Sequence, residues 1–329
     1  KNQLTDNYSF MSDNSTGLTQ KDKIALLPTD FENVLGEKIS PQLSGWIESH
    51  PFLYDNFSRA ERDSWFLKVV KTINDYNVIP AGEHRLSQWE MGWHENLAAF
   101  EKSKVASALI PRYFGKYNAV RWKQDLIKPL SIDFEYNMLA VIEYWLFEKY
   151  LKDVPSIYEF GCGTSHNLLR ARQINKTASL HGCDWTSTAE KIISLLKEAG
   201  LEKNVSGHLF DFFNPDNNFH LEPGSAVYTV AALEQAGQNF EKFITYLLSN
   251  KPKICVHIEP ITELLDDTNF LDYLSIEYFK KRNYLNGFLH FLRKLELGGR
   301  IKIHQAQRTY IGSLFVDGYS VVVWSPAGF

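Results

Sequence analysis

The second half of the chain, from about residue 155 onward, alternates short apolar runs with helical segments. This alternation is typical of a parallel β-sheet whose strands are joined by helices. The runs expected to be strands are 156–160, 180–184, 205–211, 225–231 and 253–259. One connecting helix is well marked, because Ser187 and Glu190 have the spacing of a capping box and Gly200 provides a stop signal. The sequence therefore predicts an α/β fold with a doubly wound sheet over residues 154–329.

The end of the chain has a different pattern. A helical stretch is expected over 268–297, and strand-like runs follow at 300–309 and 319–324. The link between these two runs is too short for a crossover helix, so they are expected to pair antiparallel.

The first half of the chain lacks this alternation. Residues 1–40 are polar with little periodicity, which predicts a flexible or surface-draped lead-in. Region 41–153 has the apolar spacing of helices, for example over 59–76 and after Asp133, which is expected to be a helix N-cap. We therefore expect a helical cap or substrate region before the catalytic α/β domain.

The composition of the chain limits its expected binding partners and its expected cellular location. The 35 basic and 39 acidic residues give a net charge of −4, so the chain lacks the basic surplus that favours nucleic-acid binding. Cys162, Cys183 and Cys255 have no paired spacing, which argues against a disulfide framework or a structural zinc site and favours a cytoplasmic location. No apolar run is long enough to predict a membrane span. Because the chain begins at Lys1, we expect it to be part of a longer polypeptide.

A loop with two glycines follows the first expected strand. Gly161 and Gly163 allow a tight turn that brings backbone N–H groups close to a ligand at the carboxyl edge of the sheet. Asp184 follows Gly163 by 21 residues, close to the offset at which a carboxylate meets ribose hydroxyls. Asp211 and Phe212 close the third strand, where they suit an adenine base or are ordinary turn residues.

The sequence of the same loop helps to decide between two candidate cofactors that contain adenosine. A dinucleotide-binding fingerprint needs glycine at position 166, but this chain has His166, which opposes a nicotinamide cofactor. Glu159 at the start of the loop could instead hold the cationic end of an amino acid.

These residues resemble the first motif of the class I S-adenosylmethionine-dependent methyltransferases, acid-x-G-x-G-x-G, with Ser165 in place of the last glycine. The resemblance covers residues 155–329 and implies a seven-stranded, mostly parallel sheet with a C-terminal antiparallel strand. It also implies S-adenosylmethionine as cofactor and S-adenosylhomocysteine as product. Glu159, Gly161 and Gly163 would line the methionine portion, Asp184 would hold the ribose, and Asp211 with Phe212 would take the adenine. The cofactor residues expected in this way are Glu159, Gly161, Gly163, Ser165, His166, Asp184, Trp185, Asp211, Phe212 and Ala231.

Candidate catalytic residues lie on the fifth strand. His257 and Glu259 are two residues apart, so they share one face of the strand near the ligand-binding edge. They could act as a base and its orienting carboxylate, or as ligands of a divalent metal, so a metal requirement stays open. The alternative is a histidine satisfied inside the sheet and a carboxylate that caps the next helix.

The substrate site is less defined by the sequence. The resemblance places 230–235 between cofactor and substrate, where many relatives carry Leu-Glu-His and this chain has Leu233, Glu234 and Gln235. Arg282, near Tyr284, could clamp an anionic group, and Trp89 with Trp93 could stack on sugar rings or pack against the catalytic domain.

We therefore expect O-methylation of a sugar or glycan hydroxyl. A small natural product or a protein side chain is the alternative acceptor, and a non-catalytic scaffold that binds the cofactor is the alternative class.

Overall fold

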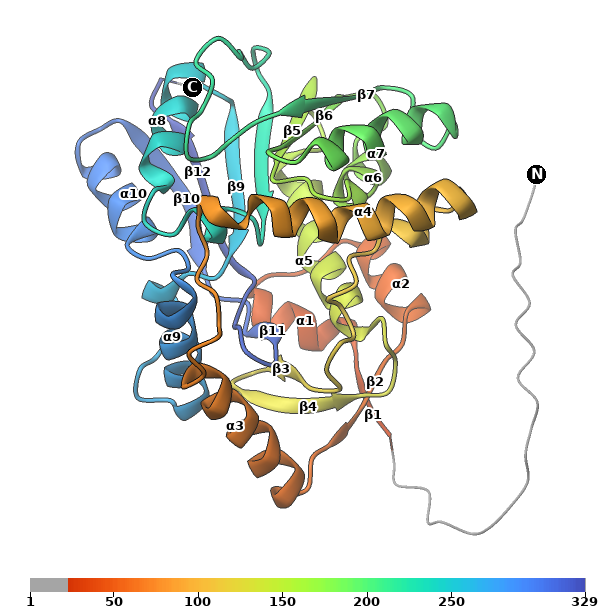
Figure 1. Cartoon of the computed structure of the whole chain (residues 1–329), viewed down its shortest axis with the longest axis vertical. Helices are drawn as coiled ribbons and strands as arrows, with labels where there is room; N and C mark the ends of the chain where they lie inside the picture. The colour runs from red at the N-terminus through yellow and green to blue at the C-terminus, as the bar shows by residue number, and fades with distance from the viewer. Residues whose placement is uncertain (1–22, 329) are drawn as a thin grey trace.

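The computed structural model describes residues 23–328 and contains a large sheet of seven strands (Figure 1). Its strands, in spatial order, are β10 (Ile301–Gln307), β12 (Ser320–Pro326), β9 (Ile254–Glu259), β8 (Ala226–Val230), β5 (Ser156–Phe160), β6 (Ser179–Asp184) and β7 (Val205–Leu209). The pairs from β9 to β7 are parallel, whereas β12 is antiparallel to both of its neighbours. The sheet is therefore the seven-stranded, mostly parallel sheet that was expected, and each expected strand is confirmed to within a few residues.

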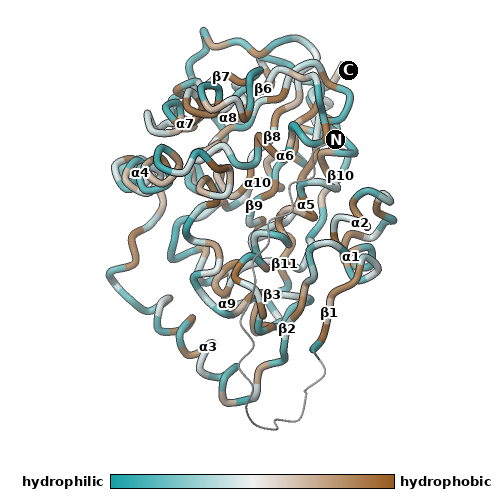
Figure 2. Tube along the Cα trace, turned by 90° about the vertical axis from the view of Figure 1, so that its right-hand side faces the viewer, coloured by the Kyte–Doolittle hydropathy of each residue, from teal (hydrophilic) through white to brown (hydrophobic). Residues whose placement is uncertain are grey.

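Helices cover both faces of this sheet. Successive side chains in a strand point to opposite faces, and because both sets are apolar here, each face is buried under helices. Ile157 faces one hydrophobic cluster with α5 (Phe134–Tyr150), α6 (His166–Ile174) and α7 (Ser187–Glu198). Tyr158, the next residue, faces a second cluster with α8 (Phe240–Asn250) and α10 (Phe288–Leu297). Figure 2 shows hydrophobic strand segments inside the molecule and hydrophilic loops around them. The sheet is therefore doubly wound.

The strand order reverses beside β5. The chain passes from β5 to β6 and β7 on one side, then returns to place β8 on the other side of β5. At such a switch point the loops that leave neighbouring strands diverge and open a crevice at the carboxyl edge of the sheet. The two-glycine loop leaves β5 at this point.

The expected helix over 268–297 is wrong in one respect, because the structure divides it into α9 (Phe270–Arg282) and α10. Asn283 ends α9 in a left-handed conformation with φ 52°, and Gly287 precedes α10 with φ 80°. A left-handed residue cannot continue a right-handed helix, so these residues break the stretch.

The first half of the chain is not purely helical, which corrects the expectation for 41–153. It contains α2 (Pro41–Ser49), α3 (Arg59–Ile73) and α4 (Leu86–Ser103), but also an antiparallel sheet. The strands of this small sheet, in order, are β1 (Ile24–Leu26), β2 (Phe52–Asn56), β4 (Asp125–Pro129), β3 (Val120–Trp122) and β11 (Ile311–Ser313). Because β11 comes from the far end of the sequence, the two halves share one sheet.

The predicted lead-in is also partly wrong. Residues 1–22 lie outside the described part, but β1 and α1 (Pro28–Leu35) occupy much of 24–35. Phe31 and Leu35 of α1 are buried in the main hydrophobic cluster. Packing by these few apolar side chains orders a segment whose composition is otherwise polar.

Short 3-10 helices complete the described elements: η1 (Glu83–Arg85), η2 (Ala106–Leu109), η3 (Leu233–Ala236) and η4 (Thr262–Leu264). Within residues 23–328, every helix is too short or too polar to cross a lipid bilayer.

Candidate active site

A cavity of about 460 Å³ opens at the switch point of the large sheet. Its volume is in the usual range for small-molecule sites. The loops that follow β5, β6, β7 and β8 form one side, and α4, residues 111–119, the end of α9 and residues 313–319 form the other. The sequence-predicted residues that line it are Trp89, Trp93, Gly161, Gly163, His166, Asp184, Trp185, Phe212, Ala231, Glu234, Arg282 and Tyr284.

The glycine loop is shaped by close packing. Gly161 has φ 76°, and a Cβ atom there would lie 2.3 Å from the Cβ of Ala232. Its N–H donates to the carbonyl of Cys183 (2.7 Å), and the N–H of Gly163 donates to the Asp184 carboxylate (2.9 Å). These bonds fasten the loop to the end of β6, so the turn is held open toward the cavity.

Asp184 stands where a ribose-binding carboxylate was expected. It also accepts hydrogen bonds from the N–H and hydroxyl of Thr186, at 2.9 and 2.6 Å. Burial raises the pKa of Asp184, and these bonds partly offset that rise. The carboxylate lines the cavity while its position is fixed by the two loops beside it.

Glu159, expected to contact the cofactor directly, is not among the residues that line the cavity. Its carboxylate is buried and accepts from Asn167 Nδ2 (2.8 Å) and the Tyr228 hydroxyl (3.0 Å). Asn167 does line the cavity, and its Oδ1 is buried without a hydrogen-bond partner. The sequence missed Asn167, although it is in the first turn of the helix that follows the motif. Glu159 therefore holds the Asn167 side chain in place at the cavity wall.

Two residues of this site have strained backbones. Ser165 (φ 63°) is buried behind the loop at the start of α6, whereas Ala231 (φ 46°) lines the cavity at the end of β8. Non-glycine residues in this conformation are uncommon and concentrate at functional sites.

Asp211 has the contacts of an ordinary turn residue, the alternative to the expected adenine contact. Its carboxylate accepts from the Phe213 N–H (2.8 Å) and from Asn214 Nδ2 (3.1 Å), so it stabilises the turn after β7 and is not part of the cavity wall. Phe212 and Trp185 do line the cavity, joined by Phe213, which the sequence missed. The flat walls at this end are therefore aromatic.

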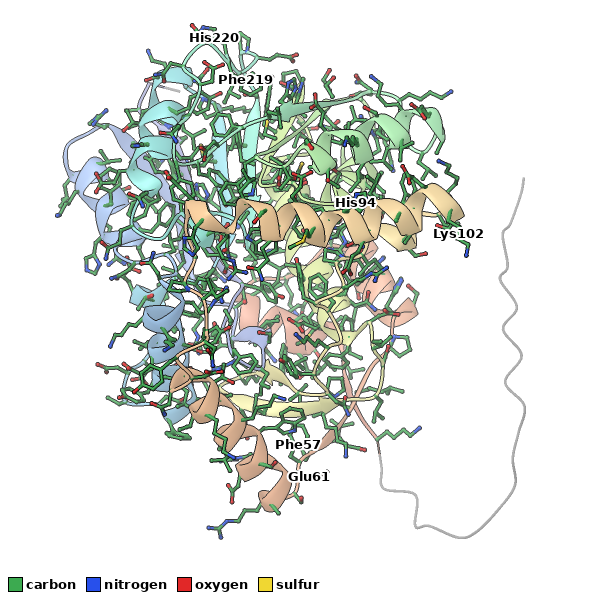
Figure 3. All side chains as sticks on the ribbon, in the orientation of Figure 1. Phe57, Glu61, His94, Lys102, Phe219 and His220 are labelled. Carbon is green, nitrogen blue, oxygen red and sulfur yellow. The ribbon has the colours of Figure 1, made fainter. Side chains whose placement is uncertain are left out.

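Helix α4 covers the glycine loop. Figure 1 shows it in orange, running across the middle of the molecule. A Cβ atom on Gly163 would lie 2.8 Å from the Trp93 ring, and Trp89 is beside Trp93, with 5.2 Å between ring centroids. His94 and Lys102, marked in Figure 3, lie on the exposed side of the same helix. Trp93 therefore contacts the loop expected to hold the cofactor.

Glu90 fastens α4 to the N-terminus of α7. Its carboxylate accepts from the N–H groups of Ser187 and Thr188 (each 2.9 Å) and from both of their hydroxyls. Burial raises the pKa of Glu90, but these hydrogen bonds together outweigh it and leave the pKa below its usual value. The expected capping box of Ser187 and Glu190 is therefore replaced by a carboxylate from a distant helix, which no local sequence signal indicates.

His257 and Glu259, the expected catalytic pair, are both fully buried away from the cavity. His257 is fully buried, bonded to Thr229 Oγ1 (3.0 Å) and to the Trp324 indole N–H (3.0 Å), and burial lowers its pKa to about 3. The Glu259 carboxylate accepts hydrogen bonds from the N–H groups of Ala232 and Leu233, at 3.1 and 3.0 Å. Neither side chain lines the cavity, because their side of β9 is covered by packed side chains. Their contacts are those of the structural alternative, a histidine satisfied inside the sheet and a carboxylate that holds the following turn.

Glu234 is one of three carboxyl groups that line the cavity, together with Asp184 and Glu135. It is 8% exposed and follows β8 in η3. Burial raises its pKa to about 8, with a further rise from Glu259, while the charge of Arg282 lowers it. Gln235 Nε2 donates to it at 3.0 Å. A carboxyl group that titrates near neutral pH is suited to proton transfer.

Unpartnered polar atoms concentrate in this cavity. Of 13 buried side-chain N or O atoms without a partner among the described residues, six belong to residues that line it. They are Arg85 Nε, Trp89 Nε1, His166 Nε2, Asn167 Oδ1, Gln235 Oε1 and Arg282 Nε. Buried polar atoms are normally paired, so their concentration here indicates a site that pairs them with a ligand.

Metal ligands are not grouped in this part of the chain. Within residues 23–328, no three His, Cys, Asp or Glu side chains are arranged to hold an ion.

Comparison with known proteins gives structural but no sequence matches. No protein-family model matches the chain, and no curated protein matches it. The fold is similar to that of the mitomycin 7-O-methyltransferase MmcR, with 12% identity, coverage of 73% of this chain and 68% of that chain, and a TM-score of 0.43. It is also similar to human N-acetylserotonin methyltransferase (12%, 82% and 68%, TM-score 0.44) and to the O-methyltransferase TomG from Streptomyces achromogenes (13%, 82% and 99%, TM-score 0.39). Each similarity is one of fold, so the activity of this chain is inferred below from its own residues.

Proposed function

We propose that this chain is an S-adenosylmethionine-dependent methyltransferase that acts on an oxygen atom of a small acceptor. The observation that carries the proposal is the cavity at the switch point, where a fixed glycine loop, a carboxylate, aromatic walls and unpartnered polar atoms meet. A nucleoside joined to an amino acid needs each of these partners. The expected cytoplasmic location is part of the proposal, supported by three buried cysteines without disulfides.

The cofactor would be held by residues from successive strand ends. Asp184 is placed for the ribose, and Trp185 with Phe212 and Phe213 for the base. Asn167 Oδ1 is a hydrogen-bond acceptor suited to the ammonium of the methionine portion. When bound, S-adenosylmethionine supplies a methyl carbon on a sulfonium sulfur, and transfer breaks that bond as the acceptor oxygen bonds to the carbon. The main task of the protein is to align the acceptor and exclude water.

Glu234 is the proposed general base. A hydroxyl acceptor must lose its proton, and the Glu234 carboxylate can accept it within the cavity. Gln235 holds one of its oxygens, which orients the carboxylate. This assignment replaces His257, which is sealed inside the sheet.

The acceptor is proposed to be a sugar or glycan hydroxyl. The support is the mixture of rings and polar groups beside Glu234, including Tyr278, Tyr284 and Arg282, because rings stack on sugars while polar groups bind hydroxyls. Trp89 and Trp93 were expected to bind substrate. Because Trp93 lies against the glycine loop with Trp89 beside it, we propose that they serve the cofactor end.

The test is a binding and turnover experiment with the purified chain. We expect S-adenosylhomocysteine to raise the melting temperature and NAD to leave it unchanged. We expect methyl transfer from labelled cofactor to a panel of sugars and glycans. Stabilisation by NAD alone would overturn the cofactor assignment. Tight cofactor binding without turnover on sugars, small phenols or protein would favour a non-catalytic scaffold, and turnover only on a non-sugar acceptor would overturn the substrate assignment.

A further inference from the structure

Two arginines meet at the end of the cavity beyond Glu234. Arg85 is the last residue of η1, and Arg282 is the last residue of α9, nearly 200 residues later in the sequence. Nη1 of Arg85 and Nη1 of Arg282 both donate to the carbonyl oxygen of Ile79, at 3.2 and 2.5 Å. Because they share one acceptor atom, the two guanidinium groups lie side by side.

The backbone holds this pair in place. The N–H of Ala81 donates to the carbonyl of Arg282 (2.6 Å), and Asn283 Nδ2 donates to the carbonyl of Ala81 (3.3 Å). The segment before α4 is thus fixed to the end of α9. The arginines are therefore brought together by the fold, not by flexible side chains on a surface.

The pair lacks a negative partner. Among residues 23–328, no carboxylate lies within 4.0 Å of either guanidinium. The Nε atom of each arginine is buried without a hydrogen-bond partner, and both residues line the cavity. Burial and the charge of Arg282 lower the pKa of Arg85. Two adjacent, partly buried cations without a counter-ion repel each other, so the arrangement favours binding of an anion.

The surroundings suit a ring that carries this anion. Tyr278 stacks on Phe315 with centroids 5.1 Å apart, and the Tyr284 ring lies 5.3 Å from the Arg282 guanidinium carbon. Glu234, the nearby acid of the cavity, titrates at about pH 8 and is mostly uncharged at neutral pH. It therefore repels an incoming anion only weakly.

We propose that Arg85 and Arg282 bind a carboxylate or phosphate group of the methyl acceptor. Arginine pairs bind such groups through parallel charge-assisted hydrogen bonds. The inference rests on the proposed function and restricts its substrates to acidic molecules, such as uronates or sugar phosphates. The carboxylate of the cofactor is the other possible source of the anion. We assign the acceptor because Glu234, Tyr278 and Tyr284 surround the pair, whereas the unpartnered Asn167 Oδ1 marks the methionine end at the glycine loop.

The test compares matched neutral and anionic sugars. Binding of glucose, glucuronate, glucose 6-phosphate and inorganic phosphate is measured by calorimetry, with and without saturating S-adenosylhomocysteine. We expect each anionic sugar to bind at least about tenfold more tightly than glucose, an effect that weakens as salt is raised. Arg85→Gln and Arg282→Gln should each remove about tenfold of this preference and leave the affinity for S-adenosylhomocysteine unchanged.

Two further sets of variants control for charge and folding. Lys280→Gln removes a positive charge from the exposed side of α9 and should keep the preference. Arg85→Lys and Arg282→Lys keep the charge and should retain part of it, which separates anion binding from a folding defect.

Two results would overturn the inference. One is equal affinity of the wild-type chain for glucose and the anionic ligands, or no binding of any anion. The other is a loss of S-adenosylhomocysteine affinity in the arginine variants without a change in anion preference, which would assign the pair to the cofactor. Failure of the wild-type chain to bind S-adenosylhomocysteine would instead contradict the proposed function, and the measurements without it would still test the arginine site.

Discussion

The two ends of the cavity are built in different ways. The cofactor end uses consecutive strand ends, namely the loops after β5, β6, β7 and β8, so its residues follow one another along the sequence. The acceptor end combines the segment before α4, residues 113–119, the end of α9 and residues 313–319. A local motif can therefore reveal the first end, whereas the second exists only after the chain has folded. The predictions below test whether chemistry and binding divide between the two ends in the same way.

The largest effect is expected from Glu234→Gln, which removes the proposed base between the two ends. General-base catalysis contributes about 10² to 10⁴ in rate, so methyl transfer should fall by at least about 100-fold while S-adenosylhomocysteine binds normally. Single-turnover transfer of labelled methyl groups measures this loss. A variant that keeps wild-type activity would show that Glu234 is not the base.

The pH dependence sharpens the same assignment. Glu234 must be unprotonated to accept a proton, and burial raises its pKa to about 8. The rate should therefore rise about tenfold per pH unit below pH 8 and level off above it. The raised pKa also means that stability falls as pH rises from about 4.5 to 8, because the folded state holds this proton more tightly than the unfolded state. Glu234→Gln should reduce this loss in urea denaturation.

A backbone change should affect the cofactor end alone. In Gly161→Ala the new Cβ would lie 2.3 Å from Ala232 and the residue would keep a positive φ, so we expect at least about tenfold weaker binding of S-adenosylhomocysteine and a loss of about 1–3 kcal/mol in stability. Gly200→Ala is the matched control, since Gly200 also has a positive φ (70°) but no neighbour within 4 Å of the new atom. It should lose stability without losing cofactor affinity.

Weakening the contact between α4 and α7 should have a moderate effect on stability and on cofactor dissociation. Glu90→Gln removes a charged acceptor from a helix N-terminus, which costs about 1–2 kcal/mol. Because α4 covers the glycine loop, we expect faster dissociation of S-adenosylhomocysteine in stopped-flow experiments. Glu95→Gln, on the exposed side of the same helix, should leave dissociation unchanged. Since the pKa of Glu90 is lowered, its contribution is present above about pH 4.5 and is lost only in more acidic solution.

The smallest effect on activity is expected from His257→Leu. This change leaves the Trp324 N–H and the Thr229 hydroxyl without their partner, so stability should fall by about 1–3 kcal/mol. The rate per folded molecule should stay within about twofold of wild type. Trp324→Phe, which breaks the same bond from the other side, should behave alike. A large selective loss of rate in His257→Leu would restore this histidine as a catalytic candidate.

The sequence predicted the sheet well because its signals are local. Apolar runs mark the strands, and Gly161 and Gly163 mark the turn that the ligand-binding edge requires. It failed where a side chain has two possible environments. His257 and Glu259 share a face of β9, but the sequence does not show that packed side chains cover that face. Asp211 likewise follows a strand whether it binds adenine or stabilises a turn. Only the structure shows that its carboxylate accepts hydrogen bonds from Phe213 and Asn214 of the turn.

The amino-acid sequence by itself determined which residues stand at the carboxyl ends of successive strands, from the glycine loop to Asp184 and Phe212. These residues meet because neighbouring parallel strands end at the same edge of the sheet. Only the tertiary structure decided that α4 covers this loop, that Glu234 lies inside the cavity, and that Arg85 meets Arg282. The physical reason is that these contacts join segments far apart in the chain, and their free energy comes from packing and burial that no local pattern encodes.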